Sequence, residues 1–104
     1  GTAVAFSNAG DAVIVTSSGT PYVQAYHWTS ATGFGTKYSN PATLPSATAL
    51  GVSFDISGAS VAVAFNASPS VYVYPWNSST GWGTKYADPS VLPSVGARDV
   101  TFSI

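Results

Sequence analysis

The chain has 104 residues, of which 45% are hydrophobic and only 7% charged, with a net charge of −1 and no cysteine. This length and apolar content are enough for one folded domain and exclude a disordered chain. There is no basic stripe, so we expect no nucleic-acid partner. No apolar run approaches the ~20 residues of a membrane span, so we expect no membrane partner, and without cysteine there is no disulfide.

Short apolar segments separated by turn residues run along the first half of the chain. Val, Thr, Tyr and Phe favour strands, whereas the Gly, Pro, Ser and Asn between them favour turns. The pattern predicts an all-β fold whose first four strands are Ala3–Ser7, Ala12–Thr16, Tyr22–Trp28 and Gly33–Tyr38. Proline cannot donate a ladder hydrogen bond, so the prolines of 40–45 predict a connection there.

The second half of the chain repeats the first. Residues 3–50 align with 51–98 without a gap, with 21 identities in 48 positions. The most distinctive shared stretch is Trp-x4-Gly-aromatic-Gly-Thr-Lys-Tyr, at Trp28–Tyr38 and again at Trp76–Tyr86. A period of this length with four strands per repeat predicts antiparallel β-propeller blades.

The second copy makes the strand pattern clearer. Its second strand is expected at Ser60–Phe65. In its third strand, Val71 and Val73 should face one side of the sheet and Tyr72, Tyr74 and Trp76 the other. The glycines at 10, 33, 58 and 81 are explained by the backbone geometry of turns.

The repeat begins a third time near the C-terminus. Asp99-Val100-Thr-Phe102 matches Ala3-Val4-Ala-Phe6, which predicts a third copy of the first strand at 99–104. The domain organisation is therefore a single domain, 1–104, with one blade at 3–50 and one at 51–98.

Each repeat resembles the WD40-like repeat. The motif is Val4-Ala-Phe6-Ser7-Asn-Ala-Gly10 followed by an apolar strand and an aromatic strand that ends in Tyr26-His-Trp28. Thr29 and Asn77 stand where that repeat has Asp, and the Gly-His pair is absent. The resemblance implies a divergent propeller blade in which the tryptophan packs inside the blade.

Two blades cannot close a ring of four to eight. Head-to-tail association of identical chains would close it, with three copies making six blades, and two or four copies making four or eight. Val4 and Phe6 of one copy, and Val100 and Phe102 of another, are the residues expected in that assembly. Either the third first strand completes a neighbour's blade, or one terminus is redundant.

The chain has few residues for catalysis. The single histidine, His27, aligns with Pro75, and there is no Cys or Glu. The four aspartates occupy non-equivalent positions in the repeat, and no Gly-x-Ser-x-Gly elbow is present. We expect no enzyme, no metal site and no cofactor.

Aromatic and polar residues of the repeated loop are the candidate ligand-binding residues: Trp28, Phe34, Trp76, Asn77 and Trp82. Aromatic faces beside amides and hydroxyls can stack on and hydrogen-bond to a sugar. This segment is similar to that of small two-blade fucose-binding lectins, which implies trimerisation, although their Arg and Glu have no repeated counterparts here. Packing within the blades explains the same aromatics.

Two hypotheses follow. The first is a non-enzymatic, self-assembling propeller module, whether a natural fragment of a longer repeat array or a reconstructed protein. The alternative is a carbohydrate-binding or adhesion module of microbial or viral origin, for which an extracellular or virion location would be expected.

Overall fold

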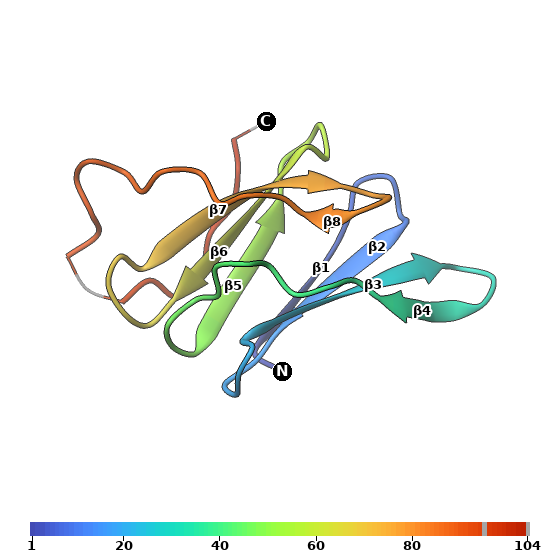
Figure 1. Ribbon diagram of the computed structural model, residues 1–104, viewed down its shortest axis with the longest axis horizontal. Helices are drawn as coiled ribbons and strands as arrows, with labels where there is room; N and C mark the ends of the chain where they lie inside the picture. Colours follow the sequence, from blue (N-terminus) through green and yellow to red (C-terminus); the bar gives the residue numbers. More distant parts are fainter. Residues whose placement is uncertain (95, 104) are drawn as a thin grey trace.

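A computed structural model describes residues 1–94 and 96–103 and has an all-β fold (Figure 1). The first antiparallel sheet has the order β1 (Ala3–Phe6), β2 (Ala12–Thr16), β3 (Val23–Thr29) and β4 (Gly33–Lys37). The second has the order β5 (Ala49–Phe54), β6 (Ser60–Phe65), β7 (Val71–Asn77) and β8 (Gly81–Trp82). The described residues form no helix, so none is present that could span a membrane.

The strands expected within each repeat are confirmed, with small shifts at their ends, whereas the third first strand is not formed. β2 and β6 have the predicted bounds, β1 and β4 end one residue earlier than predicted, and β3 is shifted by one residue at both ends. β8 is much shorter than its counterpart β4. Backbone hydrogen bonds from Gly83 to Pro75 (2.8 Å) and from Tyr86 to Val73 (2.9 Å) nevertheless continue the pairing beyond β8.

The four turn glycines adopt the backbone conformation expected of them. Gly10 and Gly58 have φ of 75° and 76°, and Gly33 and Gly81 both have φ of 85°. A residue with a Cβ is strained in this left-handed region, whereas glycine is not. Equivalent hairpins of the two sheets are therefore built by the same local geometry.

Strand register gives each sheet two different faces. Val4, Phe6 and Trp28 share one side of the first sheet, which we call its aromatic face; the second sheet's aromatic face carries Val52, Phe54, Val61, Val63, Tyr74 and Trp76. The opposite side of each sheet is the aliphatic face, made by Ala12, Ile14, Val23 and Ala25 in the first sheet and by Ala62, Ala64, Val71 and Val73 in the second. The predicted alternation along β7 is thus confirmed.

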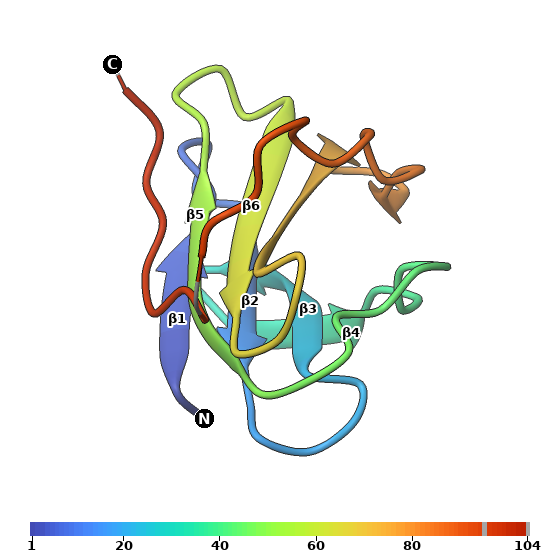
Figure 2. The ribbon, with the colours of Figure 1, turned by 90° about the vertical axis from the view of Figure 1, so that its left-hand side faces the viewer.

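The core lies between the two sheets. The aliphatic face of the first sheet packs on the aromatic face of the second, in one buried cluster that includes Ile14, Val23, Phe54, Tyr74 and Trp76. Strands β1 and β5 lie side by side at the inner edge of this interface, and the outer strands spread apart (Figure 2). The other two faces, one on each side of the molecule, have no sheet against them.

The C-terminal residues 96–103, which we call the tail, run back past β5 (Figure 2). A Cβ on Gly51 would lie 2.7 Å from the Cα of Asp99, so the tail packs closely on β5. Residues 99–103 form no strand, and Ile104, the last residue of the predicted third first strand, lies outside the described residues.

Candidate functional site

Trp76 is at the centre of the interface between the two sheets. It is 7% exposed and makes edge-to-face contacts with Tyr38, Phe54 and Trp82, at centroid distances of 4.9, 5.4 and 5.5 Å. Tyr38, which follows β4 of the first sheet, is the contact that crosses between the sheets. The position of Trp76 is therefore that of a packing residue, buried among aromatic rings of both sheets.

Trp28 has the same position in the first sheet but has no sheet packed over it. Its ring contacts Phe6 and Phe34 edge-on, each at 5.2 Å between centroids. Phe34 is an exposed aromatic side chain, whereas its counterpart Trp82 is half-buried. The aromatic face of the first sheet is consequently a packing surface that no second sheet of the described chain covers.

Exposure of equivalent residues measures the difference between the two aromatic faces. Val4 is 60% exposed and its counterpart Val52 is 8% exposed. Phe6 is 52% exposed and its counterpart Phe54 is 8% exposed. Each pair has the same residue type and the same place in the repeat, so the difference in exposure comes from what packs around each strand and not from the side chains themselves.

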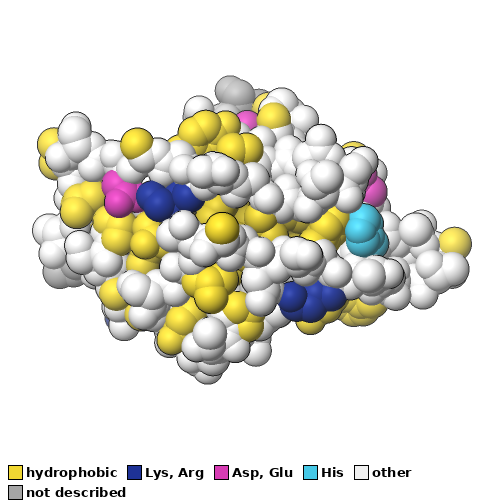
Figure 3. Space-filling view, in the orientation of Figure 1, with side chains coloured by type: hydrophobic (Ala, Val, Ile, Leu, Met, Phe, Trp, Pro, Cys, Tyr) yellow, Lys and Arg dark blue, Asp and Glu magenta, His cyan; other side chains and the backbone are white. Residues whose placement is uncertain are grey.

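The opposite end of the molecule shows the complementary difference. Tyr38 is 5% exposed because it lies between the sheets, whereas its counterpart Tyr86, after β8, is 49% exposed. Val91 and Leu92, in the connection that follows Tyr86, are also exposed. On the face of the molecule that Figure 3 shows, hydrophobic side chains are prominent and charged groups are few.

Hydrogen bonds fix how one sheet sits on the other. The Tyr38 hydroxyl donates to the Ser78 carbonyl at 2.6 Å, and the Tyr74 hydroxyl donates to the Thr43 carbonyl at 2.7 Å. The Asn8 amide donates to the Asp55 carbonyl at 2.7 Å. Each bond joins an element of the first repeat to one of the second, so the packing has a defined register.

Burial changes the acidity of both interface tyrosines. Desolvation raises the pKa of Tyr38, and the Asp11 carboxylate raises it further. Desolvation also raises the pKa of Tyr74 far above its usual range, with a smaller contribution from Tyr72. Both phenols therefore remain protonated donors at neutral pH.

The other polar candidates serve local structure. The His27 ring stacks on Tyr38 with 3.9 Å between centroids. Lys85 forms an ion pair with Asp88 at 2.6 Å and lies 4.5 Å from the centroid of the Tyr72 ring. Among residues 1–94 and 96–103, no three His, Cys, Asp or Glu side chains lie together as metal ligands.

The five predicted ligand-binding residues lie in two separate groups. Trp28 and Phe34 are together on the open aromatic face, and Trp76 and Trp82 are together at the sheet interface. Asn77 uses its side-chain oxygen to accept a hydrogen bond from the Ser79 backbone at 2.8 Å, which fixes its own turn. Of the four predicted assembly residues, Val4 and Phe6 are exposed on β1, and Val100 and Phe102 lie in the tail.

Sequence reasoning did not identify Tyr38 and Tyr74 as interface residues. Both tyrosines recur in the other repeat, as Tyr86 and Tyr26, and this recurrence could have identified them. A recurring tyrosine within or just after a strand has a packing body and a hydroxyl that needs a partner when buried. The partners are backbone carbonyls of the other repeat, and no sequence pattern marks those.

The chain is thus an all-β protein of two equivalent four-stranded sheets that pack through a defined aromatic interface. A comparison with models of known protein families and a comparison with curated proteins each found no match.

Proposed function

We propose that the chain is a non-enzymatic β-propeller module whose main role is to assemble with further copies of itself. The observation that carries this proposal is the relation between its buried and open surfaces. The single chain contains one complete sheet-to-sheet interface. At one end, the aromatic face of the first sheet is open, and at the other end Tyr86 is exposed where its counterpart Tyr38 is buried. A second copy placed head to tail would join them.

The internal interface gives the contacts expected between copies. Tyr86 of one copy would pack on Trp28 of the next, as Tyr38 packs on Trp76 at 4.9 Å. Its hydroxyl would donate to the Ser30 carbonyl of that copy, as Tyr38 donates to Ser78. These pairings follow from adding one repeat length to each observed contact.

Closure into a ring determines the number of copies. The sheets spread from a shared inner edge, as blades do around a propeller axis (Figure 2). Three copies would give six blades, which is our proposal, and two or four copies would give four or eight. In a closed ring of head-to-tail copies, both surfaces of every copy are covered by a neighbour.

The tail bears on how copies are connected. Residues Thr101–Ser103 lie near Ile56. One repeat earlier, the same contact is seen between Asp55, the counterpart of Ser103, and Asn8, the counterpart of Ile56. Asp99 also approaches Gly51 closely. Both contacts lie where the first strand of a third blade would begin. We propose that the tail serves as the first strand of the next copy's blade and takes the place of that copy's β1.

A direct measurement of mass tests this function. Native mass spectrometry and light scattering over a range of concentrations should give a discrete species of three chains. Two or four chains would keep the assembly function and change the blade number. A chain that stays monomeric at high concentration would refute the proposal.

A further inference from the structure

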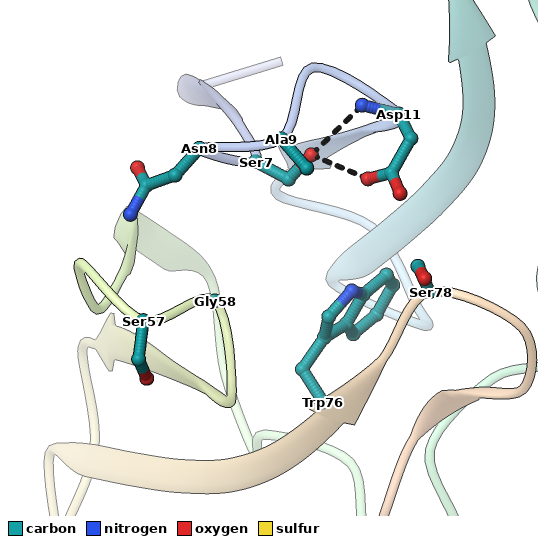
Figure 4. Close-up of a pocket in the computed structure, with 8 residues that line it drawn as sticks. All are labelled: Ser7, Asn8, Ala9, Asp11, Ser57, Gly58, Trp76 and Ser78. Atoms are coloured by element: carbon teal, nitrogen blue, oxygen red, sulfur yellow. Dashed lines mark hydrogen bonds between the residues drawn. The ribbon is translucent and has the colours of Figure 1, made fainter.

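A pocket lies between the two sheets at the end where their first hairpins turn (Figure 4). Ser7, Asn8 and Asp11 line it from the first sheet, and Trp76 and Ser78 line it from the second. Its volume is about 170 Å³, whereas a water molecule takes up about 30 Å³ of liquid. The pocket is too large for a single water and smaller than the ~300–1,000 Å³ of sites for drug-sized ligands.

The Trp76 indole nitrogen is a donor without a partner in this pocket. It is buried, and none of the described residues accepts a hydrogen bond from it. Figure 4 shows this nitrogen turned toward the loop that carries Ser7 and Asp11. A buried N–H that makes no hydrogen bond costs about 1–3 kcal/mol, so an acceptor that enters the pocket gains this amount.

Acceptors are held across the pocket from the indole. The Ser7 hydroxyl donates to Asp11 Oδ1 at 2.8 Å and accepts from the Asp11 backbone N–H at 3.1 Å (Figure 4). It also accepts from the Ala12 backbone N–H at 3.1 Å. These bonds fix the carboxylate in place. Within the part of the chain that the structure describes, Asp11 Oδ2 accepts no hydrogen bond, so it is available to a ligand donor.

The polarity of the pocket selects the class of ligand. A ligand must accept from an indole N–H and donate to a carboxylate, and a hydroxyl group does both. The pocket has no cationic side chain, so an anion such as phosphate would be repelled by Asp11. One carboxylate is too few for a divalent cation that takes six or more oxygen ligands.

We propose that this pocket binds one ring of a neutral carbohydrate, with one hydroxyl oxygen accepting from Trp76 Nε1 and a neighbouring hydroxyl donating to Asp11 Oδ2. The indole takes part through its nitrogen, because the ring is buried against Tyr38, Phe54 and Trp82. Both ligand contacts, from Trp76 and Asp11, come from one chain. In a ring closed by exchange of the tail, Ser103 of the neighbouring copy would take the place of Ser7 beside Asp11.

The repeat predicts one such site per chain. The counterparts of Asn8 and Asp11 in the second repeat are Ile56 and Ala59. A pocket formed at the equivalent place between two copies would therefore lack the side chains of Asn8 and Asp11. Its carboxylate would come from Asp55, at the position of Ser7, where Oδ1 accepts from Ser57 and Ala59. The loss of these two polar side chains makes the pocket within the chain chemically distinct.

The indole N–H resonance of Trp76 is the direct probe. The protein labelled with ¹⁵N would be titrated with D-galactose, D-mannose, L-fucose, D-glucose and N-acetyl-D-glucosamine, with the indole signals assigned by Trp28→Phe and Trp82→Phe. At least one sugar should shift the Trp76 signal to saturation, with a Kd on the order of 1 mM for a few hydrogen bonds. The other two indole signals should not move.

Substitutions at matched positions complete the test. Asp11→Asn keeps an acceptor for Ser7 but replaces the charged Oδ2, and should weaken binding about tenfold or more. Asp88→Asn makes the same change of charge at a residue outside the pocket that is paired with Lys85, and should leave the affinity unchanged. The proposal is overturned if no sugar shifts the Trp76 signal, which would mean that water alone fills the pocket, or if Asp11→Asn binds as tightly as the unmodified protein.

Discussion

The substitution Tyr86→Ala is the sharpest test of assembly, because Tyr38 provides a matched position within the chain. Tyr86 and Tyr38 occupy the same place in the repeat, but Tyr86 is 49% exposed and Tyr38 is 5% exposed. If Tyr86 enters an interface like that of Tyr38, its exposure must fall by the same difference. Tyr86→Ala should then weaken assembly and leave the fold of the single chain intact.

The size of the effect follows from the buried area. A tyrosine buries about 200 Å², so a fall from 49% to 5% exposure removes roughly 90 Å² from water. At about 25 cal/mol per Å², this burial stabilises each interface by about 2 kcal/mol. The hydrogen bond from the hydroxyl adds about 1 kcal/mol. The total of about 3 kcal/mol corresponds to roughly a hundredfold loss of affinity per interface.

Sedimentation velocity measures this loss, and urea unfolding of dilute protein measures the stability of the single chain. Tyr38→Ala is the control: it should destabilise the single chain by about 3–5 kcal/mol, because it empties a formed interface. Tyr86→Phe should weaken assembly only about fivefold, through the lost hydrogen bond. An interface role for Tyr86 is refuted if Tyr86→Ala assembles like the unmodified protein, or if it unfolds as readily as Tyr38→Ala.

Three further predictions address the tail and the titrating groups. Deletion of 99–104 should weaken assembly by about tenfold or more, because main-chain pairing between copies is lost; an unchanged mass by light scattering would show that β1 supplies the strand. The raised pKa of Tyr74 means that the folded state holds this proton more tightly, so its contribution to stability is present below about pH 10 and lost as the pH rises above that value. Unfolding followed from pH 9 to 12 should show a smaller loss in Tyr74→Phe, and equal losses would contradict the assignment. A hydrogen bond from Ser57 lowers the pKa of Asp55, so the stability from this carboxylate is present above about pH 4 and lost as the pH falls through its folded pKa. Asp55→Asn should therefore flatten the acid side of the stability profile, and an unaltered slope would argue against this.

Local features of the fold were predictable from the sequence. Short apolar runs between turn residues located β2 and β6 to the residue, and glycine marked the four turns that need positive φ. These features depend on a few neighbouring residues, so a local pattern contains them. The shortness of β8 was not predictable, since 81–86 is nearly identical to 33–38.

Features that depend on contacts between residues far apart in the sequence were harder to predict. Trp28 and Trp76 are the same residue in the same motif, and the sequence cannot say which one has a sheet packed over it. The pocket has the same origin, because Asp11 and Trp76 come together only when one sheet lies on the other. In the sequence Asp11 appears only as an aspartate without a counterpart in the second repeat.

The pairing of β1 with its own β2 has a consequence for the rate of assembly. In the single chain β1 is hydrogen-bonded to β2 from Ala3 opposite Thr16 to Phe6 opposite Val13. If the tail of another copy takes that place, this ladder must first open, so association would include a local unfolding step. Such steps make association slower than the ~10⁵–10⁷ M⁻¹s⁻¹ of rigid surfaces. Freshly diluted chains and assembled rings would then interconvert slowly, and the assembled state would persist after the concentration falls.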